Sequence, residues 1–198
     1  KNIRSFQGWG AAIHVASNGA FNIGIDGVKI EDSDRGIEVE AGARDVYANK
    51  GHLKNVYPKP YTGQPGDFAT YTFALDAHSH EGEGACINVV YEDFLLENSG
   101  GITFVRSNGT NATDLPRNCR AENVRILGYA MTTGYEAVAV QGYTNVVRGV
   151  HLMEGAGITS LMRVRIWGGG SEANRLEDIR AEAYALPLVT VDDGAVAT

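Results

Sequence analysis

The side chains of this chain best suited to chemistry gather in one short stretch, residues 76–84, which reads Asp-Ala-His-Ser-His-Glu-Gly-Glu-Gly. Three carboxylates (Asp76, Glu81 and Glu83) and two of the five histidines (His78 and His80) lie there within eight residues. Histidine titrates near neutral pH, so such a group can exchange protons with a substrate. The stretch predicts an acid–base site. The alternative is a solvated corner in which Asp76 and His78 satisfy turn amides.

The same stretch is a poor metal site. His78 and His80 are two residues apart and share one face of an extended chain, whereas Glu81 and Glu83 share the other face. A zinc site needs three or four ligands that converge on one point. We therefore expect neither a metal nor another cofactor.

A repeat indicates which elements position these residues. Two polar residues, an apolar residue, any residue and a second apolar residue recur along the chain, as in Glu122-Asn123-Val124-Arg125-Ile126. The first apolar residue of each copy falls at positions 3, 28, 56, 94, 124, 150 and 179, so the steps are 25, 28, 38, 30, 26 and 29 residues. This period is typical of stacked supersecondary units that share one core.

A second series of short runs alternates apolar with other residues, as in Ile37-Glu38-Val39 and Ile102-Thr103-Phe104. Alternation with period two marks a strand with one buried face. A leucine-rich repeat would need a Leu-x-x-Leu-x-Leu phrase, which is absent, and a helical repeat would need apolar residues three and four apart. We predict a single all-β domain over residues 1–198, a right-handed parallel β-helix of about seven coils. A β-sandwich of hairpins is the alternative.

The inward positions of both series form the predicted core. They are Ile3, Val28, Ile30, Ile37, Val39, Val56, Phe73, Leu75, Phe94, Ile102, Phe104, Val124, Ile126, Val138, Val140, Val150, Leu152, Val164, Ile166, Ile179, Leu188 and Val189. Cys86 and Cys119 fall near equivalent places in adjacent repeats, so they are either free buried thiols or a disulfide.

Aligning the second series places further carboxylates beside the acid–base stretch. If Ile37 pairs with Phe73, Glu40 lies next to Asp76 on the neighbouring strand, about 4.8 Å away. Carboxyl groups ~5 Å apart suit retaining glycoside hydrolysis, and groups ~9 Å apart suit inversion. We expect Asp76 to act as acid or base, Glu40 to be its carboxylate partner and His78 to be the alternative base.

Other residues near this column could hold a sugar chain. Those predicted to bind substrate are Arg106, His80, Glu81, Gln141 and Trp167. Arg106 would hold an anionic sugar or a developing negative charge, and Trp167 would stack against a sugar ring. Arg163 and Arg165 could hold a sugar carboxylate or pair with surface acids.

Two insertions break the period on either side of the acid–base stretch. The first, near residues 58–67, is rich in proline and glycine, and the second spans residues 107–118. Insertions in repeat folds often wall a binding groove. We expect these two to flank a groove over Glu40, Asp76 and His78; neutral variation of loop length is the alternative.

The overall charge excludes some partners. The chain has a formal charge of −7 and a pI near 5.2, which argues against nucleic acid because phosphate binding needs a basic surface. No uncharged run of 18 apolar residues is present, so we expect no membrane span. Neither end offers a capping helix for the core, so we expect the domain to form a homotrimer or to belong to a longer chain.

The repeated phrases resemble a known superfamily. Residues 122–126 and Gly36-Ile37-Glu38-Val39 resemble the pectate-lyase-like β-helices, and residues 74–78 with 86–94 are similar to phage tailspikes and other polysaccharide-processing β-helices. The resemblance implies an extracellular or virion-associated protein that binds and cleaves a bacterial surface or matrix polysaccharide.

The kind of activity stays open at the level of sequence. The calcium-binding aspartates of pectate lyases, the paired aspartates of polygalacturonases and the Asp-Pro-His-Asp phrase of alginate epimerases are all missing. The protein is therefore expected to be a glycoside hydrolase or a polysaccharide lyase. The alternative is a non-catalytic β-helix that serves as a shaft, an adhesin or a carbohydrate-binding module.

Overall fold

The computed structural model describes most of the chain. The described residues are 2–4, 11–16, 19–57, 73–79, 82, 84–106, 114–129, 136–153, 164–166, 170–182, 188–192 and 196–197. Within these ranges the regular elements are all β-strands, and the strands belong to two parallel sheets. No helix among the described residues is long and apolar enough to cross a membrane.

The strands of the two sheets alternate along the chain. Sheet A contains β1 (Asn2–Arg4), β3 (Phe21–Glu31), β5 (Arg44–Lys54), β7 (Ile87–Ser99), β9 (Arg120–Glu122), β10 (Arg125–Tyr129), β12 (Val146–Met153), β14 (Glu172–Ala181) and β16 (Val196–Ala197). Sheet B contains β2 (Ala11–Ala16), β4 (Arg35–Glu40), β6 (Phe73–Ser79), β8 (Gly101–Arg106), β11 (Val138–Val140), β13 (Val164–Ile166) and β15 (Val189–Val191).

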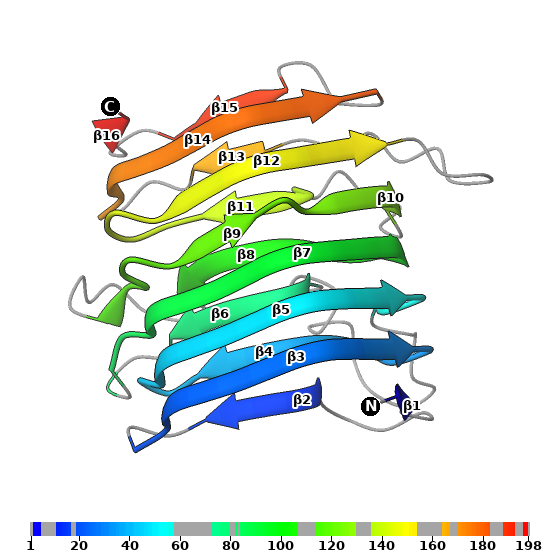
Figure 1. Cartoon of the computed structure of the whole chain (residues 1–198). Helices are drawn as coiled ribbons and strands as arrows, with labels where there is room; N and C mark the ends of the chain where they lie inside the picture. The colour runs from blue at the N-terminus through cyan, green and yellow to red at the C-terminus, as the bar shows by residue number, and fades with distance from the viewer. Residues whose placement is uncertain are drawn as a thin grey trace, which may run out of the picture.

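Figure 1 shows the two sheets stacked face to face, with their strands running in opposite directions. Each pass of the chain adds a strand to sheet A and then one to sheet B, except that β9 and β10 together take the place of one sheet A strand between β7 and β12. The molecule is therefore a parallel β-solenoid. The predicted β-helix is confirmed, with about five turns rather than seven.

Residues with positive φ shape each coil of sheet A. One column of them, at Gly27, Lys50, Asp93, Asn123, Gly149 and Asp178, lies within or beside the long strands with φ between 50° and 64°. Glycine, asparagine and aspartate tolerate this conformation best, and they occupy five of these six positions. The residue that precedes the first apolar residue of the repeated phrase therefore marks a bend in the backbone.

One copy of the phrase was assigned to the wrong bend. Val28 pairs with Gly51, and Gly51 pairs with Phe94, so Gly51 is the true counterpart rather than Val56. Asn55, before Val56, also has positive φ (54°) but belongs to the next corner of the coil, where its Nδ2 donates to Asp32 at 3.0 Å. The phrase occurs at both corners, which is why the period alone could not separate them.

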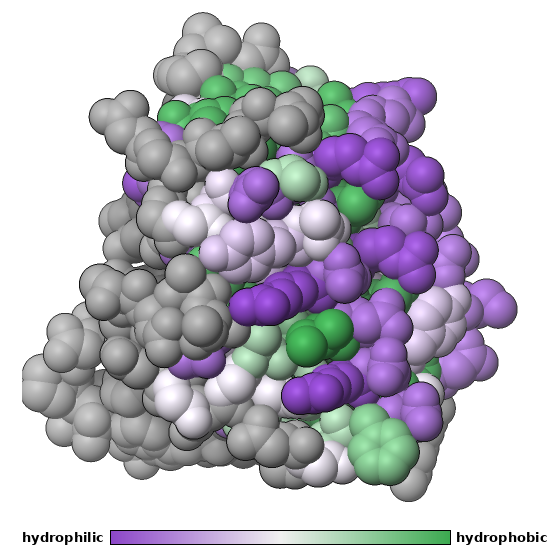
Figure 2. Space-filling model, turned by 90° about the vertical axis from the view of Figure 1, so that its left-hand side faces the viewer, coloured by the Kyte–Doolittle hydropathy of each residue, from purple (hydrophilic) through white to green (hydrophobic). Residues whose placement is uncertain are grey.

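The corners are linked from coil to coil by polar side chains. At the edge where the sheet A strands begin, Asn88 Nδ2 donates to Asp45 at 2.6 Å. At the opposite corner, Asn98 Nδ2 donates to Asn55 at 2.7 Å. Figure 2 faces the edge where the sheet A strands begin and shows hydrophilic residues recurring from coil to coil there. These ladders satisfy polar groups that the bends withdraw from the sheet hydrogen bonds.

The register of sheet B differs from the predicted one by two residues. Ile37 pairs with Leu75, not with Phe73, so Asp76 lies opposite Glu38 rather than Glu40. A close backbone approach fixes this register: a Cβ on Gly36 would lie 2.1 Å from the carbonyl oxygen of Ala74. The three alternating residues Phe73, Leu75 and Ala77 fit the apolar pattern in either register, so the pattern could not decide.

Most predicted core residues are buried, but one is exposed and two are only partly buried. Val189 is 40% exposed because β15 is the end strand of sheet B, and Ile179 and Leu188 are partly buried against the core. The side chains of Ile3 and Phe73 lie outside the described part of the structure.

The core also contains residues that the two series did not predict. Tyr91 is fully buried, stacks on Phe104 with ring centroids 6.1 Å apart and meets Phe94 edge-on at 6.3 Å. Cys86 and Cys119 are both buried and free, which answers the alternative left open by their spacing.

Candidate functional site

A row of polar side chains crosses the outward face of sheet B. The strand register places His14 opposite Glu38, Glu38 opposite Asp76, and Asp76 opposite Thr103. The alternation that buries Ile37 and Val39 in the core turns Glu38 and Glu40 to the other face of β4. The β-sheet thus brings residues from four strands side by side.

His78 is the centre of this cluster. Its Nδ1 lies 2.7 Å from Asp76 Oδ2, and its Nε2 lies 2.9 Å from Glu40 Oε2. The other oxygen of Glu40 lies 2.7 Å from His14 Nε2. Two carboxylates therefore hold the imidazole ring of His78 from both sides, and the side chain is only 8% exposed.

These contacts set the protonation of the pair. Burial by itself lowers the pKa of His78, but the charge and hydrogen bond of Asp76 and the hydrogen bond of Glu40 outweigh it and raise the pKa from 6.5 to about 10. The hydrogen bond from His78 lowers the pKa of Glu40 from 4.5 to about 2, against the effect of burial. At neutral pH the ring is an imidazolium that is ion-paired with carboxylates, so it is a poor general base.

Glu38 is the member of the cluster that the sequence interpretation missed. It is 3% exposed and its carboxylate accepts a hydrogen bond from Arg35 Nη1. Burial raises the pKa of Glu38, the Arg35 charge opposes this rise, and the Asp76 charge adds to it. The signal for Glu38 was its place in Gly36-Ile37-Glu38-Val39, but the two-residue error in register gave Asp76 another partner.

Two oxygen atoms in the row have no hydrogen-bond partner among the described residues. They are Asp76 Oδ1 and Thr103 Oγ1, both buried and on adjacent strands. From the core side, Tyr91 Oη donates to the backbone carbonyl of Asp76 at 2.5 Å. Asp76 is thus fixed at its backbone and at Oδ2, while Oδ1 keeps its full capacity to accept a hydrogen bond.

The cluster has the spacing of a cation site but not its free ligand atoms. Oxygen and nitrogen atoms of Glu38, Glu40 and His78 lie within 4.8 Å of one another. Both ring nitrogens of His78 already face carboxylate oxygens at hydrogen-bonding distance. A cation could bind His78 only after the proton on Nε2 had left, so the arrangement favours an ion-paired network over a metal centre.

The structure brings together the three residues predicted to be catalytic, Glu40, Asp76 and His78. Gln141 is half-buried and directly follows β11. Its backbone N donates to the carbonyl of Phe104 at 2.6 Å, and Phe104 lies on β8, the strand next to β6. Arg106 pairs through its backbone with Ser79, but its side chain lies outside the described part, as do His80, Glu81 and Trp167.

Arg165 pairs with acids, as one of its two predicted roles required. Its Nη2 lies 2.8 Å from Asp192 and its Nη1 lies 3.1 Å from Glu136. The insertion at 58–67 and the first part of that at 107–118 lie outside the described residues. At the end of the second insertion, Asp114 accepts a hydrogen bond from Gly82 N at 2.9 Å, which ties this loop to the stretch that follows His78.

Comparison of the chain with protein-family models, with curated proteins and with solved structures gives no match.

Proposed function

We propose that this chain is a carbohydrate-active β-helix of the pectate-lyase-like type that hydrolyses a bacterial surface or matrix polysaccharide at the Glu38–Glu40–Asp76–His78 cluster. One observation carries the proposal. Two carboxyl groups on the outward face of paired strands have different environments: Glu38 is buried with a raised pKa, and Asp76 bonds an imidazolium. Carboxyl groups whose environments differ in this way divide into an acid and a base or nucleophile.

The geometry assigns a role to each member of the pair. Neighbouring strands lie about 4.8 Å apart, which suits the ~5–5.5 Å separation of carboxyl groups in retaining glycosidases. Glu38, whose raised pKa favours the protonated form, would protonate the glycosidic oxygen as the bond to the leaving sugar breaks. Asp76 would attack the anomeric carbon through Oδ1, the oxygen without a partner among the described residues. Because Oδ1 is buried, the side chains that cover it would have to move aside when the sugar binds.

His78 and Glu40 would position the nucleophile. The imidazolium bonds Asp76 Oδ2, which holds the carboxylate in one orientation. Glu40 balances the charge of His78, and its second oxygen bonds His14. Water would then hydrolyse the glycosyl–Asp76 ester. Glu38, now deprotonated, would take a proton from this water and so return to its starting form. The protonated state of His78 favours this reaction over β-elimination, which needs a free base.

The setting of the reaction is part of the same proposal. A polysaccharide at the outside of a bacterial cell implies an extracellular or virion-associated protein, acting as a homotrimer or within a longer chain. The resemblance of the repeated phrases to polysaccharide-processing β-helices supports this setting.

The test is cleavage of a panel of bacterial polysaccharides, read by new reducing ends and by the absorbance of unsaturated sugars. On a cleaved substrate, Asp76→Asn and Glu38→Gln should each lower turnover by ~10²–10⁴-fold. Asp26→Asn, an exposed carboxylate on sheet A, is the matched control and should keep the wild-type rate. Unsaturated products would show that the protein cleaves by elimination and not by hydrolysis. Unchanged turnover in Asp76→Asn would place the site elsewhere. Binding without any product would favour the non-catalytic module.

A further inference from the structure

A groove runs across the outer face of sheet A, on the side of the solenoid away from the cluster. It has a volume of about 720 Å³ and is lined by residues of β3, β5, β7, β10 and β12, with Asn123 between β9 and β10. The column of positive-φ residues passes through it, including Gly27, Lys50, Asp93 and Gly149. Because these residues bend every coil at the same place, the groove continues from strand to strand.

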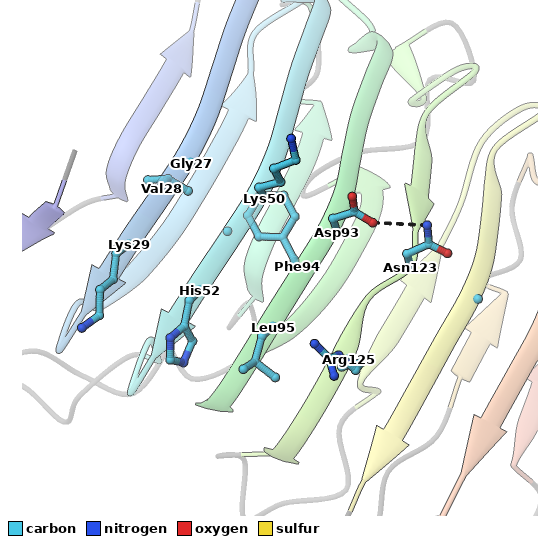
Figure 3. A pocket seen from close by; sticks show the side chains of 12 residues that line it. Gly27, Val28, Lys29, Lys50, His52, Asp93, Phe94, Leu95, Asn123 and Arg125 are labelled. Atoms are coloured by element: carbon cyan, nitrogen blue, oxygen red, sulfur yellow. Dashed lines mark hydrogen bonds between the residues drawn. The ribbon is translucent and has the colours of Figure 1, made fainter.

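Cationic side chains line this groove. Lys29, His52, Leu95 and Arg125 form one row across four paired strands, as Figure 3 shows. Lys50 lies beside this row, in the column of bends. The chain as a whole carries a charge of −7, so a groove lined by three Lys and Arg residues and one carboxylate is a local exception.

Two of these cations are available to a ligand. Lys29 pairs with Glu31 at 2.7 Å and His52 pairs with Glu97 at 3.0 Å. Lys50 and Arg125 are exposed and form no ion pair with any residue in the described part of the chain. The single lining carboxylate, Asp93, accepts a hydrogen bond from Asn123 Nδ2 at 3.3 Å (Figure 3).

The spacing of these cations selects a class of ligand. Lys50 on β5 and Arg125 on β10 are two strand steps apart along the solenoid, or about 10 Å. A nucleic acid strand carries a phosphate about every 3.4 Å, so the acids at the groove margin, Glu31 and Glu97, would repel it. A polymer with sparse charge avoids that repulsion, and Leu95 offers an apolar contact between the cations.

We infer that this groove binds an extended acidic polysaccharide that carries about one carboxylate for every two sugars. Arg125 would bond a sugar carboxylate with its planar guanidinium, and Lys50 would pair with the next carboxylate along the polymer. The inference goes beyond the proposed function and does not depend on it, because a binding groove on sheet A is separate from chemistry on sheet B.

The test measures binding of unsulfated chondroitin oligosaccharides by calorimetry at low salt, with the whole chain carrying Asp76→Asn so that the probe stays intact. Lys50→Asn and Arg125→Gln should each weaken binding by about tenfold or more, since each removes a charged hydrogen bond. Asparagine tolerates the positive φ of Lys50, so the first variant should fold normally. Arg44→Gln is the matched control, an exposed arginine of sheet A outside the groove, and should bind as the parent does.

Three results would overturn the inference. The first is equal affinity for the carboxyl-reduced oligosaccharide, which would show that charge does not matter. The second is unchanged affinity in both groove variants, which would move any binding elsewhere. The third is tighter binding of polyphosphate than of the oligosaccharide, which would identify a ligand with dense charge. Binding that weakens with added salt and is lost in the groove variants would support the inference, whatever the outcome of the cleavage assays.

Discussion

At the scale of single residues, the ion pair between His78 and Glu40 makes stability depend on pH at both ends of the range. The folded pKa of His78 is raised from 6.5 to about 10, so its contribution is full below pH 6.5 and is lost as the pH rises through 10. The folded pKa of Glu40 is lowered from 4.5 to about 2, so its contribution is full above pH 4.5 and is lost as the pH falls through 2. The pair therefore stabilises the fold most between pH 4.5 and 6.5.

The prediction concerns His78→Gln measured by urea unfolding from pH 6 to pH 10. The wild-type protein should lose more free energy of unfolding over this interval than the variant does, because the variant has no imidazolium to titrate. Comparing the two proteins removes the contribution of groups that do not interact with His78. A parallel pH dependence in both would mean that His78 is not charged in the folded state.

At the scale of strands, the close contacts of glycine fix the register that assembles the site. A Cβ on Gly36 would lie 2.1 Å from the Ala74 carbonyl oxygen, and one on Gly101 would lie 1.8 Å from that of Ala137. We predict that Gly36→Ala and Gly101→Ala each lower the free energy of unfolding by roughly 1–3 kcal/mol, the usual cost of overpacking.

Gly24→Ala is the control for these two variants. It lies in β3, has open space around its Cβ position and does not have positive φ, so alanine should be neutral or slightly stabilising there. Urea unfolding of the three variants gives the comparison. Equal costs at all three positions would mean that the strands can move apart at Gly36 and Gly101, and that the register has another cause.

The same strands show how far the sequence alone could lead. Period-two alternation predicted the two sheets and most of the core, because burial on one face of a strand follows directly from residue type. The cluster was predicted in part: Asp76, Glu40 and His78 were expected to lie together and do so, but Glu38 was not expected there. Its partner depends on register, and Phe73, Leu75 and Ala77 permit two registers that the alternation cannot separate. The glycine at position 36 carried the missing information.

The groove on sheet A could not be predicted from the repeats for a related reason. Lys29, His52 and Arg125 are far apart in the sequence and meet only through the pairing of β3, β5, β7 and β10. The repeated phrase at Val56 pointed to the wrong bend, so neither His52 in the row nor Lys50 beside it could be aligned with the residues of the neighbouring strands. Only the structure shows which polar residues have positive φ.

At the scale of the whole molecule, the core joins the two sheets and supports the site from inside. Phe104 of β8 stacks on Tyr91 of β7, and Tyr91 Oη in turn bonds the backbone of Asp76 on β6. One aromatic contact thus links sheet A, sheet B and the candidate nucleophile. We predict that Phe104→Ala lowers the free energy of unfolding by about 3–5 kcal/mol, since it opens a cavity in a fully buried position.

Tyr91→Phe separates support of the site from stability of the core. It keeps the ring and its stacking on Phe104 but removes the hydrogen bond to the Asp76 carbonyl, so its cost in stability should be near 1 kcal/mol. If the core positions Asp76, turnover of a cleaved polysaccharide should fall in Tyr91→Phe although the protein remains folded, with the change in kcat rather than in KM. Wild-type kcat in a folded Tyr91→Phe protein would show that β6 positions Asp76 without help from the core. Core packing would then affect the stability of the protein but not the geometry of Asp76.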